Sequence, residues 1–138
     1  MPTDKQFLGI APYFFVRDIN KAVAYYRDVL GFTVEKIWGE PPCFAMPSRD
    51  GLIVMLSEQC DESRIRPNGA DGETWDAYIW VKDADKLFAE FKSKGATVAY
   101  EPVDREFYGN REFAVKDLDG YILAFAHDMA SHQKAKRD

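Results

Sequence analysis

The sequence FVRDINKAVAYYRDVLGFTV, residues 15–34, recurs in altered form as WVKDADKLFAEFKSKGATV at residues 80–98. Each stretch passes from an apolar segment to an aspartate, then through a helix-like segment to a glycine and a second apolar segment. Asp18 and Asp83 are expected to cap helices, because their carboxylates can accept backbone N–H groups of the first turn. A glycine after the last apolar position is typical of a helix C-terminus. Both stretches therefore predict a strand, a helix and a strand in that order.

A second pair of matching blocks lies downstream of these stretches. Phe44-Ala45-Met46 and Asp50-Gly51-Leu52-Ile53 correspond to Phe113-Ala114-Val115 and Asp119-Gly120-Tyr121-Ile122. Two matching blocks in the same order indicate a tandem duplication, which must be identified before the fold is assigned. We predict one domain at 8–128, with module one at 8–58, a linker at 59–73, module two at 74–128 and a polar tail at 129–138.

Each module is predicted to have the order βαβββ. Apolar and alternating segments indicate strands, and the Asp-Gly pairs favour tight turns because glycine tolerates positive φ. In module one we expect strands at 10–17, 32–38, 43–46 and 52–56, with a helix at 19–30. In module two we expect a helix from Ala84 to the stop at Gly95, a long loop at 101–110, and strands at 77–81, 97–100, 112–115 and 121–126. The polar tail is expected to be a frayed helix or disordered.

The composition excludes several classes of protein. The chain has 138 residues, of which 46% are hydrophobic and 14% aromatic, so it is not intrinsically disordered. Its net charge of −5 disfavours nucleic-acid and anionic-membrane partners, which need clustered Lys and Arg. Cys43 and Cys60 form no CxxC motif, so we interpret them as reduced thiols. With no secretory signal and no run near the roughly 20 apolar residues of a membrane span, we expect a cytoplasmic protein.

Two segments carry a family resemblance: VRDINKAVAYYRDVLGF at 16–32 and GNREFAVKDLDGYILAF at 109–125. With the tandem βαβββ plan, they resemble the glyoxalase/bleomycin resistance/extradiol dioxygenase superfamily, also called vicinal oxygen chelate proteins, and its bleomycin-resistance branch. The resemblance covers about residues 8–128. It implies an α+β fold in which tandem βαβββ modules form a curved mixed sheet, a half-barrel, with the helices outside. It also implies a homodimer, because small members usually pair their half-barrels.

The resemblance further implies four metal-ligand positions, two in each module. In this sequence they are occupied by Ala11, Met55, Asp76 and Ala124. Alanine has no donor atom and a thioether is a poor ligand for the divalent ions these enzymes use, whereas a catalytic metal takes at least three protein ligands as a rule. No GxSxG, HExxH, GxxxxGK[ST] or GxGxxG motif is present either. We therefore predict no metal, no cofactor and no catalytic residue. The alternative is a metal-dependent lyase or dioxygenase of the same superfamily with its ligands elsewhere.

Alternation along the strands predicts which side chains face the open side of the sheet. Large rings above Ala11 and Ala124 would leave room for a ligand, and Tyr and Trp favour a pocket because their polar groups need partners. A filled core made of the same rings is the alternative. Asp76 is the one charge expected there, so the expected ligand is a small aromatic or cationic molecule; alternatively, Asp76 is solvated or pairs with Arg111. The candidate ligand-binding residues are Tyr13, Phe15, Trp38, Phe44, Met55, Asp76, Tyr78, Trp80, Tyr108 and Arg111.

Overall fold

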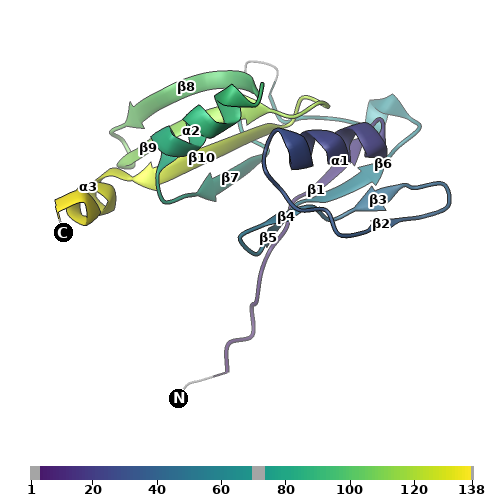
Figure 1. The fold of residues 1–138 in the computed structure, drawn as a ribbon, viewed down its shortest axis with the longest axis horizontal. Helices are drawn as coiled ribbons and strands as arrows, with labels where there is room; N and C mark the ends of the chain where they lie inside the picture. Colours follow the sequence, from purple (N-terminus) through teal and green to yellow (C-terminus); the bar gives the residue numbers. More distant parts are fainter. Residues whose placement is uncertain (1–3, 70–73, 138) are drawn as a thin grey trace.

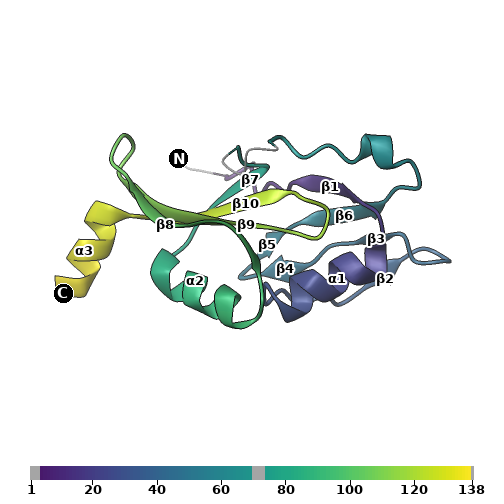
Figure 2. The ribbon, with the colours of Figure 1, turned by 90° about the horizontal axis from the view of Figure 1, so that it is seen from above.

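The computed structural model describes residues 4–69 and 74–137, so residues 70–73 of the predicted linker and Asp138 of the tail lie outside the described residues. Figures 1 and 2 show the chain as two larger sheets, each with a helix packed against one face. In chain order, the elements are β1 (Tyr13–Val16), α1 (Ile19–Asp28), β2 (Ile37–Trp38), β3 (Phe44–Ala45), β4 (Ser48–Arg49), β5 (Leu52–Ile53), β6 (Met55–Glu58), the 3-10 helix η1 (Glu62–Arg64), β7 (Ala77–Trp80), α2 (Ala84–Ser93), β8 (Thr97–Arg105), β9 (Asn110–Lys116), β10 (Ile122–Asp128) and α3 (Met129–Arg137).

The two halves of the chain build sheets of the same plan. The strand order is β1-β6-β3-β2 in the first sheet and β7-β10-β9-β8 in the second. In each sheet the opening strand pairs in parallel with the closing strand, and the remaining pairs are antiparallel. The α+β fold of two βαβββ units is confirmed. Helices α1 and α2 cover the same side of the two sheets, and only the short helix η1 of the described residues lies on the other side, next to the first sheet (Figure 2).

The helices begin where the sequence predicts. Asp18 accepts a hydrogen bond from the backbone N–H of Lys21 at 3.0 Å, and Asp83 accepts one from Lys86 at 3.1 Å. Each carboxylate thus satisfies a donor that the first helical turn leaves unpaired. Gly31, just after α1, has a φ of +74°, which a glycine adopts without steric strain.

Strand alternation separates a buried face from an open face. Phe14, Val16 and Leu56 are buried in the core cluster that also contains the helix residues of α1, as the alternation predicts. In the second half, Phe91 of α2 packs edge-on against Phe125 of β10, with ring centroids 5.2 Å apart. The strand residues that alternate with these buried residues therefore face the other side of each sheet.

The strands of the first module are shorter than predicted. The expected strand 32–38 forms only β2, plus one bridge between Thr33 and Ser48. The expected strand 52–56 is divided between β5 and β6, because the Asp50-Gly51 turn pairs β5 with β4 in a separate hairpin. Both turn residues have positive φ, 52° and 82°, as a two-residue hairpin turn requires.

The second module has longer strands than predicted. Residues 101–110, expected as a loop, instead extend β8 to Arg105 and start β9 at Asn110. The ladder contains two register shifts, between Val98 and Tyr100 and between Tyr100 and Val103. Such bulges let a strand continue past Pro102, which has no backbone N–H to donate. The polar tail is the helix α3.

Side chains from the turn between β9 and β10 join the two modules. Tyr26 of α1 donates its hydroxyl to buried Asp117 at 2.8 Å, and the backbone N–H of Arg17 donates to Asp119 at 2.9 Å. The Phe14 and Tyr121 rings stack with centroids 4.3 Å apart. The strands of the two sheets form separate hydrogen-bonded ladders over the described ranges. The modules are therefore held together by packing and buried polar contacts rather than by one continuous ladder.

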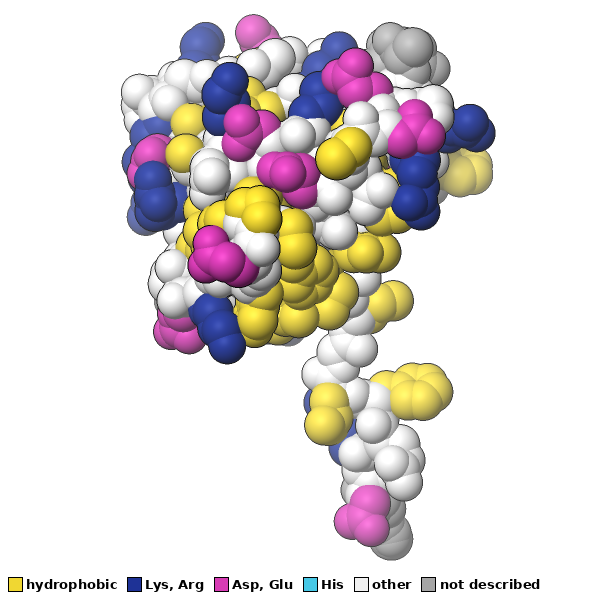
Figure 3. All heavy atoms as spheres, turned by 90° about the vertical axis from the view of Figure 1, so that its right-hand side faces the viewer, with side chains coloured by type: hydrophobic (Ala, Val, Ile, Leu, Met, Phe, Trp, Pro, Cys, Tyr) yellow, Lys and Arg dark blue, Asp and Glu magenta, His cyan; other side chains and the backbone are white. Residues whose placement is uncertain are grey.

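Residues 4–12 form an extended N-terminal arm that projects from the body of the molecule (Figure 1). Its apolar side chains are almost fully exposed: Phe7 is 89% exposed, Leu8 87% and Ile10 95%. Figure 3 shows hydrophobic side chains on the arm and on the adjoining part of the body. None of the described helices is both long enough and apolar enough to cross a membrane.

Candidate functional site

A buried carboxylate lies at the centre of the open face of the second sheet. Glu112 of β9 is completely buried. The hydroxyl of Tyr78 donates to it at 2.9 Å and that of Tyr108 at 2.5 Å, and Tyr100 donates through a shorter contact. The guanidinium of Arg105 also donates to it at 3.3 Å. Four donors therefore satisfy the carboxylate, which would otherwise be costly to bury.

These donors keep Glu112 ionised. Burial alone would raise the pKa of Glu112, but the hydrogen bonds from Tyr100, Tyr108 and Tyr78 outweigh it and leave the pKa below its ordinary value. Burial and the bond to Glu112 raise the pKa of Tyr100 to about 12, and the same causes raise that of Tyr108. At neutral pH the cluster is thus a carboxylate anion surrounded by neutral tyrosines, with one arginine beside it.

The aromatic rings around Glu112 form a continuous set along the open face. The ring centroids of Trp75 and Tyr78 are 4.4 Å apart, and those of Tyr78 and Trp80 are 4.8 Å apart. The indole N–H of Trp75 donates to the Tyr100 hydroxyl at 2.8 Å. Trp80 is 65% exposed and Tyr108 42%. We call Trp75, Tyr78, Trp80, Tyr100 and Tyr108 the aromatic face of the second sheet.

Small residues lie beneath the aromatic face. Ala114 and Ala124 are fully buried and form a separate cluster with Ile122, against which Trp75, Tyr78 and Tyr100 pack. Ala124 lies opposite Tyr78 in the parallel ladder, so both belong to the same face, as the alternation predicts. The outer rings, Trp80 and Tyr108, are left exposed by the described part of the chain, so a flat molecule can reach them.

A second aromatic group occupies the open face of the first sheet. Tyr13 lies edge-on to Phe15 at 5.4 Å and tilted to Phe44 at 6.4 Å, and Phe44 lies 5.7 Å from Trp38. Met55 is the register partner of Tyr13. The five predicted residues of the first module are therefore brought together on one face.

A groove of about 330 Å³ runs along one edge of this group. Tyr13, Phe15 and Asp76 line it, together with two arginines of the connector, Arg64 and Arg66. The guanidinium of Arg64 lies 4.6 Å from the centroid of the Phe15 ring. The lining includes neither Tyr78 nor Trp80, so the single aromatic wall predicted from both modules is replaced by two groups.

Asp76 is bound by backbone groups. Its carboxylate accepts hydrogen bonds from the backbone N–H of Asn68 at 2.7 Å and of Ile122 at 2.8 Å. It therefore fixes the start of β10 and the end of the connector, and its charge lies in a groove that also holds two arginines. The alternative in which Asp76 pairs with Arg111 is wrong, and so is the expectation that Asp76 is the one charge near the open face.

Arg111, which was predicted to bind ligand, lies apart from the aromatic face. It neighbours Glu112 in β9, so it faces the opposite side of the sheet, toward α2. There its guanidinium pairs with Asp85 at 3.0 Å and with Asp104 at 2.8 Å. Because neighbouring residues of a strand face opposite sides of the sheet, Glu112 belongs to the open face and Arg111 does not.

Four residues of this cluster were not predicted from the sequence: Glu112, Trp75, Tyr100 and Arg105. Glu112 could have been assigned to the open face from the sequence. It lies two positions from Ala114 and four from Lys116, and residues an even number of positions apart on a strand share a face. Trp75 lies just before β7, and Tyr100 and Arg105 lie in the stretch whose strand is longer than predicted. Three of the four implied metal positions, Ala11, Met55 and Ala124, have no oxygen or nitrogen side-chain donor.

Comparisons with known proteins agree with the fold and extend it. The family model described as "Glyoxalase/Bleomycin resistance protein/Dioxygenase superfamily" matches residues 9–125. A bleomycin resistance protein from Geobacillus stearothermophilus is 25% identical over 137 residues, which covers 84% of this chain and 93% of that protein. The structure of TioX from Micromonospora sp. ML1 superposes with a TM-score of 0.69 at 22% identity, covering 88% of this chain and 99% of that one. A bleomycin-binding protein from Streptomyces verticillus, complexed with copper(II)-bleomycin, superposes with a TM-score of 0.62 at 25% identity, covering 88% and 97%.

Proposed function

The chain belongs to the glyoxalase/bleomycin resistance protein/dioxygenase superfamily, and we propose that it binds a small, flat aromatic molecule on the aromatic face of its second sheet. The observation that carries this proposal is the set of rings around Glu112, two of which are exposed above a floor of small residues. Rings held at fixed positions by hydrogen bonds lose little freedom when a ligand stacks on them. The binding needs no metal ion and no catalytic residue.

The charges near the site favour a ligand recognised mainly through its ring system. Glu112 is offset by Arg105, and Asp76 lies in a groove with Arg64 and Arg66. A cationic group would still gain from the electron-rich faces of Trp80 and Tyr108, by roughly 0.5–2 kcal/mol for each contact. We therefore propose a flat aromatic ligand, with a positive charge as a secondary feature.

The named relatives support a role in sequestering a small molecule. One is called a bleomycin resistance protein and another was crystallised with copper(II)-bleomycin, so that compound is the first natural product to test. A resistance role would follow if binding keeps the compound from its target. A cytoplasmic location is part of the proposal, because the exposed thiols of Cys43 and Cys60 would stay reduced there. The boundaries of the modules, 8–58 and 74–128, also remain a proposal.

Truncation of the exposed indole is expected to weaken ligand binding. Proflavine is a suitable flat probe because its own fluorescence anisotropy rises when it is bound. The wild-type protein is expected to bind it with a micromolar dissociation constant, about −8 kcal/mol. Trp80→Ala is expected to weaken binding by about tenfold, since it removes one stacking surface. Addition of EDTA is expected to leave the affinity unchanged.

The control for this experiment is Leu118→Ala, in the turn between β9 and β10. Leu118 is 54% exposed and thus similar to Trp80 in exposure, but it lies away from the aromatic face. Acridine, which is uncharged at pH 8, measures the contribution of the ligand charge. The proposal is wrong if Trp80→Ala and Leu118→Ala change the proflavine affinity equally, or if EDTA abolishes binding.

We also propose that the protein is a homodimer in which the N-terminal arm packs against a second copy of the chain. Phe7, Leu8 and Ile10 are almost fully exposed on an arm that projects from the body of the molecule, and exposed apolar surface of this kind marks an interface. Light scattering at micromolar concentration is expected to give twice the mass of one chain. The combined substitution of these three residues by serine is expected to give the monomer mass, whereas Leu52→Ser, in the β4–β5 hairpin, leaves the dimer intact. A wild-type monomer would refute the dimer.

A further inference from the structure

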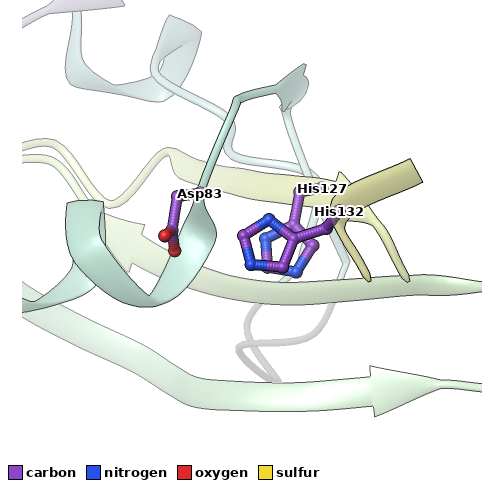
Figure 4. Close-up of side chains that lie close together, drawn as sticks. All are labelled: Asp83, His127 and His132. Carbon is purple, nitrogen blue, oxygen red and sulfur yellow. The ribbon is translucent and has the colours of Figure 1, made fainter. Parts of the chain in front are cut away.

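Two histidines and an aspartate meet on the helix-covered side of the second sheet. Asp83 lies at the start of α2, His127 in β10 and His132 in α3 (Figure 4). Their potential ligand atoms all lie within 4.8 Å of one another. Ala126, the neighbour of His127, is the register partner of Glu112, so His127 and Glu112 face opposite sides of the sheet. The cluster is thus separate from the aromatic face.

The two imidazoles are stacked. Their ring centroids are 4.0 Å apart and the ring planes are inclined by 20° (Figure 4). His127 is buried, whereas His132 is half-buried on the terminal helix. A pair of protonated imidazoles at this distance would repel, so the arrangement requires at least one neutral ring.

His127 is the neutral member. Its Nδ1 accepts a hydrogen bond from the backbone N–H of Ala84 at 2.8 Å, which a protonated Nδ1 cannot do. A histidine binds a metal ion in its neutral form, so no proton needs to be removed from an imidazolium at neutral pH.

We propose that Asp83, His127 and His132 bind one first-row divalent ion of borderline softness, with Zn²⁺ as the type case. Two imidazole nitrogens and a carboxylate oxygen form a donor set that suits Zn²⁺, Ni²⁺ or Cu²⁺ and is poor for Mg²⁺ or Ca²⁺, which take oxygen ligands. The carboxylate of Asp83 accepts a hydrogen bond from Lys86 and retains the charge that compensates the ion. Water would complete the coordination shell.

The site must contract when it binds the ion. Metal–ligand bonds of about 2.0–2.1 Å place tetrahedral ligand atoms about 3.3 Å apart, closer than the separation in the cluster. His132 can supply this movement because its ring is half-buried and is carried by a helix at the surface. The ion would also have to displace the Ala84 N–H from Nδ1 of His127, because Nε2 carries the proton in this tautomer. We therefore expect micromolar affinity, weaker than that of a closed structural zinc site.

The ion would join α3 to the start of α2. α3 follows β10 directly, and its His132 ring stacks on His127 of the sheet. A metal bond between three elements would fix the position of the terminal helix. Ligand binding to the native state alone raises the apparent melting temperature, so the same ion is expected to raise it.

The test is a calorimetric titration of the full chain, without any histidine tag, with ZnCl₂. The wild type is expected to bind one Zn²⁺ per chain with micromolar affinity. Asp83→Asn keeps a good helix N-cap but loses the anionic donor, and His132→Ala removes a ligand from the surface helix. Each is expected to weaken binding by at least about tenfold. Gln133→Ala, the next residue in α3, is the matched control and is expected to bind like the wild type.

Cobalt(II) gives a second readout that does not depend on heat. Bound Co²⁺ is expected to show visible absorption in the wild type and in Gln133→Ala, and not in His132→Ala. Far-UV circular dichroism checks that the variants are folded. The proposal is overturned if the wild type shows no saturable Zn²⁺ binding below millimolar concentration, or if either ligand variant binds as tightly as Gln133→Ala. The proflavine affinity is expected to be the same with and without Zn²⁺, so this outcome is independent of the proposed function.

Discussion

Glu112→Ala is expected to lower the free energy of unfolding by about 3–5 kcal/mol, the usual cost of removing one partner of a buried charged pair. The substitution leaves Arg105 without its carboxylate and three tyrosine hydroxyls without their common acceptor. The hydroxyls would lose the positions that hold the rings of the aromatic face. We therefore expect proflavine binding to be lost together with stability. Chemical denaturation followed by circular dichroism measures the first effect, and anisotropy measures the second.

The control is Glu101→Ala, which changes an exposed glutamate in the adjacent strand β8. A surface substitution of this kind is expected to change the free energy of unfolding by less than about 0.5 kcal/mol. If Glu112→Ala costs no more than Glu101→Ala, the hydrogen-bonded cluster does not hold the aromatic face in place.

The contribution of Glu112 to the free energy of unfolding is also expected to depend on pH. The pKa of Glu112 is lower in the folded state than in the unfolded state. The stabilisation by Glu112 is therefore present at pH values above the unfolded-state pKa, and it is lost as the pH falls through the folded-state pKa.

Asp117 is expected to have the opposite pH dependence. Burial raises its pKa from 3.8 to about 6, although Tyr26 and two backbone N–H groups donate to it. A folded-state pKa above the unfolded-state value gives stability that is present below pH 3.8 and is lost as the pH rises through 6. For a pKa shift of this size, the contribution of Asp117 to the free energy of unfolding differs by about 3 kcal/mol between low and high pH.

The Asp117→Asn variant isolates this effect. An asparagine oxygen can accept from the N–H groups of Asp119 and Tyr121, and its amide can donate to the Tyr26 hydroxyl, so we expect the variant to fold. The free energies of unfolding of wild type and variant are compared at pH 4 and pH 7. The wild type is expected to lose up to about 3 kcal/mol relative to the variant over this range. Parallel stability curves for the two proteins would show that Asp117 does not carry the raised pKa.

Features set by neighbouring residues were predictable from the sequence. Asp18 and Asp83 predict their helices because capping is decided within one turn of the chain. Phe14 and Val16 could be assigned to the core, and Tyr13 and Phe15 to the other face, because alternation is a local property of a strand. The recurrence of these patterns at two places gave the tandem βαβββ plan.

Features set by tertiary contacts were not predictable in the same way. The cluster around Glu112 combines side chains from β7, β8, β9 and the turn between β8 and β9, and its members lie up to 34 residues apart in sequence, from Tyr78 to Glu112. Asp76 accepts hydrogen bonds from two backbone N–H groups, those of Asn68 in the connector and of Ile122, which lies 46 residues away. Whether Arg111 or Glu112 faces the open side depended on a register that only the β9–β10 ladder fixes.

The most direct test of the proposed function is a nuclear magnetic resonance titration that follows the indole N–H signals of the three tryptophans. Trp75 and Trp80 belong to the aromatic face of the second sheet, and Trp38 belongs to the group on the first sheet. Addition of proflavine is expected to shift the signals of Trp75 and Trp80 together, with saturation at the dissociation constant found by anisotropy. If neither signal moves, or if Trp38 alone responds, the ligand does not bind on the aromatic face.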